Sequence, residues 1–410
     1  MGRHAGCAKV AGNAPGLVLL AVICCTGLAA CVAAEPPTPQ TGMTDMIFFI
    51  SDQRIGAIRP DGSGECYPDF TLPEETHWRL GYVSPDGRWA EISNLPFYGV
   101  QSTEPLRKWR YDFVSKTLTE IPRILGEALP GGERFLQIEN TGPGPGGVFT
   151  LFTTDRDGGS REDVFSGPGY AYGVSLRPAG RKVAYHITNT PGHPGYEIYA
   201  VDIQTKGRVL IASDDQYLHF APVWSPDSQW LVYQRCAFHQ DPGHERSDLC
   251  LSRADGTQHR ALTTGQRHWF GANYGTPERQ MGGSNMPVWA PGSKIACTLF
   301  LPDSQPPWPL VDGVRGYHPE LAKGGTQVCL IDPATGETTP ITHDDPPTWN
   351  FRLAYSPDGS RLAGVRADVG KMPALWVMDA DGGNRRFLTR GRNGAGVDHI
   401  RWVRLAVPSL

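Results

Sequence analysis

The sequence lacks the short motifs that identify many hydrolases and nucleotide-binding enzymes. It contains no GxSxG nucleophile elbow, no HExxH pair and no glycine-rich loop that leads into a helical pattern. The missing nucleophile elbow argues against a serine peptidase, the missing HExxH pair leaves a metal site without motif support, and the missing glycine-rich loop leaves nucleotide use without support. A long basic run is also absent and the formal net charge is −4. Since phosphate binding needs a basic face, we expect no nucleic-acid partner.

The chain also lacks an apolar run long enough to span a bilayer, and its most apolar stretch, residues 17–28, is near the N-terminus. That stretch suits the core of a signal peptide. It ends in Leu28-Ala29-Ala30-Cys31, which resembles a bacterial lipobox. We therefore expect 1–31 to be a lipoprotein signal peptide that is lipidated at Cys31, 32–43 to be a flexible tether, and 44–410 to be the folded domain. An ordinary secretory signal cleaved near Ala34, or a simple membrane anchor, is the alternative.

Export places the protein in the periplasm or on the outer cell surface, where disulfides are permitted. Five cysteines remain after residue 31, so at least one thiol stays unpaired. Two predicted strand pairs each hold a cysteine couple, Cys236 with Cys250 and Cys297 with Cys329. Disulfides and buried free thiols are equally consistent with this spacing, because a bridge between neighbouring strands demands restrictive geometry.

One turn recurs along the chain, as Ser84-Pro85-Asp86-Gly87, Ser225-Pro226-Asp227-Ser228 and Ser356-Pro357-Asp358-Gly359. Weaker copies contain Pro130, Pro178 and Pro291. Proline presets a turn dihedral, while aspartate and glycine accept the remaining turn conformations, so each copy is a tight reversal. Short alternating apolar runs flank each turn, which predicts four short antiparallel strands per unit. This is the blade of a β-propeller.

The two ends of the chain supply one further blade. Residues 46–50 and 56–59 resemble second and third strands with no first strand before them, and residues 399–403 resemble a first strand with nothing after it. Pairing these segments would close the propeller and remove exposed strand edges. We therefore expect an all-β fold with a single propeller of seven blades, or six if the poor copy near Pro130 is not a blade.

These motifs resemble the TolB-like, WSPDG-type propeller repeat family, which includes propeller domains of prolyl oligopeptidases and oligogalacturonate lyases. The resemblance covers nearly the whole chain after residue 44, and it implies a fold and little about function.

The long insertions all lie on the propeller rim opposite the Ser-Pro-Asp-Gly turns, and binding residues concentrate in long loops on a rigid scaffold. We expect loops at about 92–106, 188–195, 237–247, 264–284 and 301–325. The candidate ligand- or partner-binding residues on this rim are His77, His219, Arg267, His268, Trp269, Tyr274, Glu278, Asn285, His318, Glu320, Arg352 and His399.

Three functions fit this pattern, and one of them is a small-ligand sensory module. The first is a monomeric, non-enzymatic envelope protein, tethered through Cys31, that binds a protein partner or an envelope polysaccharide and needs no cofactor. The second is a lyase of the oligogalacturonate type, in which converging histidines hold a divalent metal and Arg267 or Arg352 faces a uronate carboxylate. The metal version requires His219, His268, His318 and His399 to point into one cavity.

Overall fold

The computed structural model describes residues 44–52, 54–68, 76–84, 88–96, 107–121, 127–130, 132–142, 146–155, 158–188, 190, 195–237, 245–292 and 294–405. Chain contacts separate Met1–Thr38 from Pro39–Leu410, and every described residue belongs to the second unit. Cys31 and the expected signal peptide and tether lie outside the described residues. No helix in the described part is long and apolar enough to cross a membrane.

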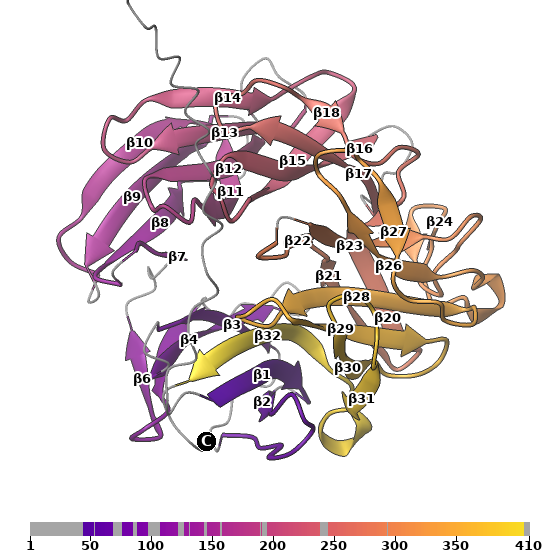
Figure 1. Ribbon diagram of the computed structural model, residues 1–410. Coiled ribbons are helices and arrows are strands. Elements are labelled where there is room, and N and C mark those ends of the chain that lie inside the picture. The colour runs from indigo at the N-terminus through magenta and orange to yellow at the C-terminus, as the bar shows by residue number, and fades with distance from the viewer. Residues whose placement is uncertain are drawn as a thin grey trace, which may run out of the picture. The chain divides into compact units, whose positions relative to one another are not determined.

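The fold is an antiparallel β-propeller in which successive groups of strands repeat the same order (Figure 1). The first three groups are β3 (Thr76–Val83), β4 (Trp89–Pro96), β5 (Lys108–Asp112) and β6 (Thr117–Ile121); β7 (Glu127–Ala128), β8 (Arg134–Asn140), β9 (Val148–Asp155) and β10 (Glu162–Pro168); and β11 (Tyr170–Leu176), β12 (Lys182–Thr188), β13 (Glu197–Asp202) and β14 (Arg208–Ala212). The weak repeat around Pro130 thus forms a four-stranded sheet, β7 to β10.

The later groups contain additional elements. They are β15 (Tyr217–Trp224), β16 (Trp230–Ala237), β17 (Arg246–Arg253) and β18 (Arg260–Ala261); β22 (Val288–Trp289), β23 (Ile295–Phe300), β26 (Thr326–Ile331) and β27 (Thr338–Pro340); and β28 (Thr348–Tyr355), β29 (Arg361–Asp368), β30 (Ala374–Asp379) and β31 (Arg386–Thr389). The 3₁₀ turn η2 (Arg392–Gly394) follows β31. A short strand, β19 (His268–Trp269), joins two of these groups into a nine-stranded sheet, so the number of blades stays a prediction.

The predicted closure between the two ends of the chain is confirmed. Strand β1 (Thr44–Ser51) pairs on one side with β2 (Arg54–Ile58) and on the other with β32 (Asp398–Leu405). Thr44 lies opposite Leu405 and Phe48 lies opposite Arg401. The apolar face of this sheet supplies Met46, Phe48 and Ile50 to a buried cluster with the neighbouring sheet. Burial of this kind contributes about 25 cal/mol per Å² of apolar surface.

Hydrogen bonds explain why serine and aspartate recur in the turn sequence. The hydroxyl of Ser225 donates to Asp227 at 2.5 Å and accepts the amide of Trp230 at 2.9 Å. Ser356 repeats both bonds, to Asp358 and from Arg361. The turn glycine has a second role. Gly359 has a φ of 71° and lies against Pro291 of the preceding turn, where an added Cβ would approach to 2.6 Å. Glycine therefore serves both the turn and the packing of neighbouring sheets.

The tryptophans at the ends of first strands pack between sheets, as the repeat predicts. Trp224 is buried and donates its indole N–H to the carbonyl of Ser175 at 2.9 Å. Trp289 makes the same bond to Val223 at 3.2 Å. Each indole thereby ties one first strand to the first strand of the preceding group.

Candidate functional site

The rim that carries the long connections lies at the far ends of the strands from Thr44. Strand β1 runs from Thr44 to Ser51, and the Ser51 hydroxyl accepts the amide of Arg392 at 2.9 Å, within the connection between β31 and β32. Two long segments on this rim lie within the described part of the chain. We call residues 264–286 the connecting segment and residues 301–325 the insertion.

The connecting segment is a structural element rather than the loop that we expected. His268 and Trp269 form β19, which pairs with β17 on one side and with β23 on the other. Both residues are fully buried. Burial lowers the pKa of His268 to about 3, so its imidazole is neutral, and its Nδ1 atom lies 3.4 Å from the Ser247 hydroxyl. This segment therefore fills the space between two sheets.

The next part of the connecting segment is a hairpin of β20 (Gly271–Thr276) and β21 (Arg279–Ser284), anchored by a buried ion pair. Arg352 of β28 bonds to Asp398 of β32 at 2.8 Å and donates to the hairpin carbonyls of Ser284 and, at 3.2 Å, Gly282. Burial opposes ionisation of Asp398, yet the Arg352 guanidinium holds the pKa of Asp398 well below its usual range. The pair ties the hairpin to two first strands.

Tyr274 and Asn285 complete this attachment. The Tyr274 ring is buried with its centroid 4.1 Å from that of Phe351. Asn285 donates to the carbonyl of Trp269 at 2.8 Å and accepts the amide of Arg352 at 2.9 Å. Four predicted site residues, Trp269, Tyr274, Asn285 and Arg352, are thus brought together. They lie inside the protein, where they hold the connecting segment in place.

The predicted histidines occupy separate environments. His219 contacts Asp214 at 2.7 Å, His399 lies 3.5 Å from Asp398, and His318 pairs with Glu320 at 3.0 Å. Among the described residues, no group of three His, Cys, Asp or Glu side chains could hold a metal ion. The described residues therefore do not fit the metal site that the lyase hypothesis requires.

The remaining predicted residues are dispersed. Arg267 reaches the carbonyl of Phe300 at 3.4 Å, and Glu278 lies in the short turn between β20 and β21. His77 belongs to β3, but its side chain is outside the described residues.

The insertion is held to the scaffold by a second buried ion pair. Arg315 bonds to Glu245 and donates to the carbonyl of Trp308 at 2.6 Å. Trp308 is buried and packs on Tyr317 with the ring centroids 5.2 Å apart. The insertion contains β24 (Leu310–Val311), β25 (Val314–Arg315) and the 3₁₀ turn η1 (Pro319–Leu321). It is therefore ordered by its own contacts.

The outer part of the insertion exposes apolar side chains. The exposed fractions are 37% for Leu310, 39% for Val311, 70% for Val314 and 44% for Leu321. These four, which we call the apolar tip, are half of the eight large apolar side chains that are exposed in the described part of the chain. Sequence reasoning missed them, although an Asp-Gly turn between apolar residues signals a hairpin.

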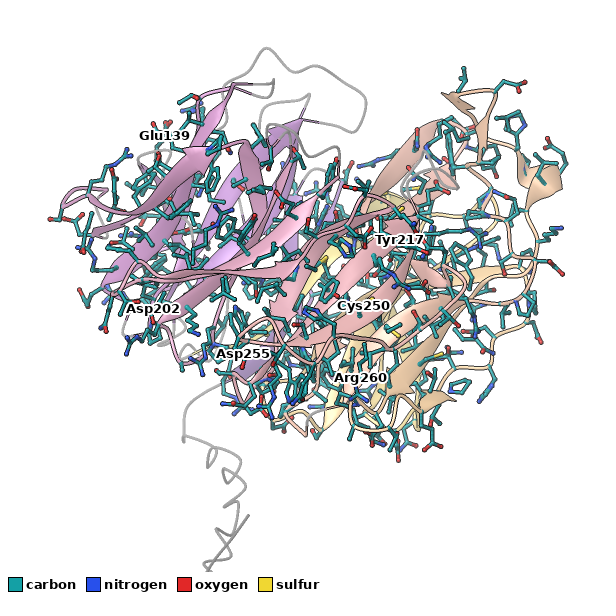
Figure 2. All side chains as sticks on the ribbon, turned by 90° about the horizontal axis from the view of Figure 1, so that it is seen from above. Glu139, Asp202, Tyr217, Cys250, Asp255 and Arg260 are labelled. Atoms are coloured by element: carbon teal, nitrogen blue, oxygen red, sulfur yellow. The ribbon has the colours of Figure 1, made fainter. Side chains whose placement is uncertain are left out.

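The five cysteines in the described part of the chain form no covalent bridge, and all five are free thiols. The register places Tyr233, and not Cys236, opposite Cys250 (labelled in Figure 2), so the first suggested bridge does not match the strand pairing. Cys297 and Cys329 are direct cross-strand partners, yet both are buried thiols. Burial raises the pKa of Cys329 to about 11, which keeps its thiol protonated.

Comparison with known proteins supports the fold. No family model and no curated protein matches the sequence. The structure is similar to an oligogalacturonate lyase in complex with manganese, at a TM-score of 0.53 and 15% identity over 85% of each chain. It is also similar to a puromycin-hydrolyzing peptidase of Mycobacterium tuberculosis, at a TM-score of 0.55 and 13% identity, covering 86% of this chain and 52% of that one. A putative TolB from Agrobacterium tumefaciens aligns with a TM-score of only 0.42. At these identities the similarity establishes the β-propeller fold alone.

Proposed function

We propose that this protein is a non-enzymatic, envelope-tethered propeller that binds a protein partner through the rim bearing the insertion. The observation that carries the proposal is the apolar tip. Four large apolar side chains are exposed on a segment that a buried ion pair and a buried tryptophan hold in place, and two of them, Val311 and Val314, lie directly opposite each other in the β24–β25 hairpin. Exposed apolar side chains on an ordered segment are typical of a protein interface. A polysaccharide surface, which is polar, complements such side chains less well.

The order of the insertion supports binding energetically. A segment that is disordered before it binds loses conformational entropy on association, which weakens the complex. Arg315, Trp308 and the neighbouring backbone bonds restrict the insertion before any partner arrives. The entropic cost of ordering the insertion on binding would therefore be smaller than for a disordered segment.

The anchor belongs to the same proposal. A lipid on Cys31 followed by the 12-residue tether 32–43 would give a reach of about 20 Å in flexible chain. The tether enters the fold at Thr44, at the ends of the strands remote from the insertion. The insertion rim would then be free to meet a partner. Replacement of Cys31 by Ser, with metabolic labelling by a radioactive fatty acid, tests the anchor: label should be lost.

The binding test uses a matched pair of substitutions. Val314→Asp places a charge in the apolar tip, while Val148→Asp places the same charge at an exposed valine of β9. Tagged proteins are crosslinked in the native envelope and purified, and associated proteins are identified by mass spectrometry. We expect one partner to be enriched with the unaltered chain and with Val148→Asp, and lost at least about tenfold with Val314→Asp. Equal recovery with both variants would contradict the proposal.

A lyase is the second candidate, because the likeness to the oligogalacturonate lyase extends over 85% of both chains. Metal analysis, with thermal-shift measurements in manganese and trigalacturonate, addresses it. Ligand at a hundredfold excess over Kd would stabilise the fold by about 2.7 kcal/mol. Bound metal with a substrate-dependent shift would favour the lyase over the binding protein.

A further inference from the structure

A small pocket lies beside the insertion, where strands β29, β30 and β31 reach the rim. Arg366, Asp368, Met372, Ala374, Phe387 and Arg390 line it. Asp368 ends β29 and Arg366 lies two residues before it, Ala374 begins β30, and Arg390 follows β31 directly. The pocket combines cations with apolar surface.

The carboxylates in and near the pocket already accept hydrogen bonds from basic side chains. Asp344 accepts bonds from Arg366 at 2.9 Å and from Arg385 at 2.8 Å. Asp368 accepts from Arg366 at 3.1 Å and from Lys371 at 3.4 Å. Burial acts against the charge of Asp344, but its bonds to Arg385 and Asn350 keep its pKa below the usual range. Asp344 therefore remains ionised, and both carboxylates are already paired.

Arg390 differs from these cations. It is exposed, and the structure assigns its guanidinium no hydrogen bond or ion pair within the described residues. The charged side chains that line the pocket are therefore two guanidinium groups, Arg366 and Arg390, and one carboxylate, Asp368. The lining has a surplus of one positive charge on a chain with a net charge of −4. A local excess of guanidinium groups attracts carboxylates or phosphates.

The apolar side of the pocket restricts the ligand further. Phe387 is 51% exposed, and the Arg366 guanidinium carbon lies 5.6 Å from the centre of its ring. Met372 and Ala374 extend this surface. A free inorganic anion would leave the ring and the methionine in water. The lining instead fits a carboxylate that is attached to, or followed by, an apolar group.

The pocket also continues into the insertion. The hydroxyl of Tyr317 lies so close to Gly370 that an added Cβ would meet it at 3.3 Å. Gly370 belongs to the turn that joins Asp368 to Met372, both of which line the pocket. Tyr317 in turn packs on Trp308 within the insertion. The insertion and the basic pocket are therefore neighbouring parts of the rim.

We propose that this pocket receives an acidic peptide segment of the protein partner, with a peptide carboxylate beside Arg390 and an adjacent apolar side chain on Phe387. This inference rests on the proposed function and adds the chemistry of the partner. The partner's segment would carry aspartate or glutamate next to the apolar residues that cover the tip. Charge complementarity would then set the register of the complex and increase the association rate.

The test uses a peptide probe with the purified full chain. The probe is fluorescein-Gly-Glu-Leu-Glu-Phe-Glu, and its counterpart has lysine in place of each glutamate. We expect saturable anisotropy for the acidic probe, no binding of the basic one, and weaker binding of the acidic probe at higher salt. Arg390→Glu should weaken binding at least about tenfold, and Phe387→Ala should weaken it less. Arg88→Glu, at an exposed arginine on another sheet, makes the same change of charge and should leave binding unaltered.

Other outcomes overturn the inference in distinct ways. Failure of the acidic probe to bind, or equal binding by Arg390→Glu, removes the pocket as its site. Trigalacturonate that competes fully, and binds more tightly than the peptide, assigns the pocket to acidic sugars instead. Val314→Asp separates the two proposals: it should abolish recovery of the partner while leaving the peptide probe bound. Loss of partner recovery only with Arg390→Glu would leave the pocket standing and contradict the role of the tip.

Discussion

The connecting segment and the insertion are similar in composition, but the structure places their side chains in opposite environments. Both extend the same rim, and each carries a tryptophan, an arginine and a histidine. The connecting segment contributes β19 between two sheets and buries His268, Trp269 and Tyr274. The insertion buries Trp308 but exposes the apolar tip. Length and composition therefore do not distinguish a loop that completes the scaffold from one that is free to bind.

Backbone pairing accounts for the burial of His268 and Trp269. Trp269 lies opposite Arg246, and His268 is paired with both Ser247 and Leu299, so β19 is part of a continuous sheet. Strands β24 and β25 pair only with each other among the described strands. A segment included in the sheet must satisfy its polar groups internally, as Asn285 does. The β20–β21 hairpin also pairs only with itself among the described strands, but Arg352 and the packing of Tyr274 hold it inside the protein. The β24–β25 hairpin has no such cover over Val314, which stays exposed.

Breaking the anchor of the connecting segment should have the largest effect. Arg352→Ala leaves Asp398 buried without its guanidinium partner and also frees the carbonyls of Gly282 and Ser284. We expect the free energy of unfolding to fall by about 3–5 kcal/mol, as measured by urea denaturation. A loss below about 1 kcal/mol would mean that the hairpin is held without this pair.

Breaking the anchor of the insertion should have a smaller and more local effect. Arg315→Ala removes the guanidinium from the buried Glu245, which keeps its bond from Asn273, and should cost about 1–3 kcal/mol. Because the insertion lies outside the main sheet, we expect protease cleavage within 301–325 before global unfolding. Arg88→Ala, which breaks an exposed ion pair with Asp112, is the control and should not expose that segment. Protection that persists in Arg315→Ala would show that Trp308 and the backbone bonds hold the insertion without this ion pair.

The two segments should also differ in their response to pH. The pKa of His268 is lowered from 6.5 to about 3 in the folded chain. Between these two pH values His268 is therefore protonated in the unfolded chain and neutral in the folded chain. Stability from this group is full above the unfolded pKa and falls as the pH drops toward the folded value. Between pH 7.5 and 5.5 His268 should account for a loss of about 1.4 kcal/mol. Buried His186 adds a similar loss, because its pKa is also about 3.

His268→Gln isolates the contribution of the connecting segment. The variant should lose about 1.4 kcal/mol less than the unaltered chain over the same pH interval, in urea denaturation curves recorded at both pH values. His318→Gln changes an exposed histidine of the insertion and serves as the control. The same pH dependence in all three proteins would mean that His268 is protonated in the fold.

The smallest effect should come from the apolar tip. Val314 is 70% exposed, so Val314→Asp should change the unfolding free energy by less than about 0.5 kcal/mol. Tyr274→Ala, in the buried hairpin, should cost about 3–5 kcal/mol in the same measurement. Comparable losses for the two variants would show that the tip is part of the core.

The parts of this fold that could be predicted are those that depend on short sequence patterns. The Ser-Pro-Asp-Gly turns need their serine and aspartate side chains for the hydrogen bonds at Ser225 and Ser356, so they could be found by inspection. The closure of β1 on β32 followed from incomplete units at the two ends. Burial of Trp224 followed from its recurrence at one position of the repeat.

The rest depends on contacts between distant residues. Arg352 and Asp398 are separated by 46 residues, and Glu245 and Arg315 by 70. Nothing local marks either pair. The two-residue strand β19 is too short to show alternation, so a polar-aromatic stretch suggested an exposed site where the chain buries it. Arg390 could not be singled out among many arginines, because only the fold reveals which of them have partners.

The most direct test of the apolar tip is site-specific photo-crosslinking in the native cell envelope. A photoreactive benzophenone side chain replaces Val314 in one protein and Val148 in another, both exposed valines. Irradiation should yield one discrete protein adduct from position 314 and none from position 148. No adduct from either position, or the same adducts from both, would contradict a partner site at the tip.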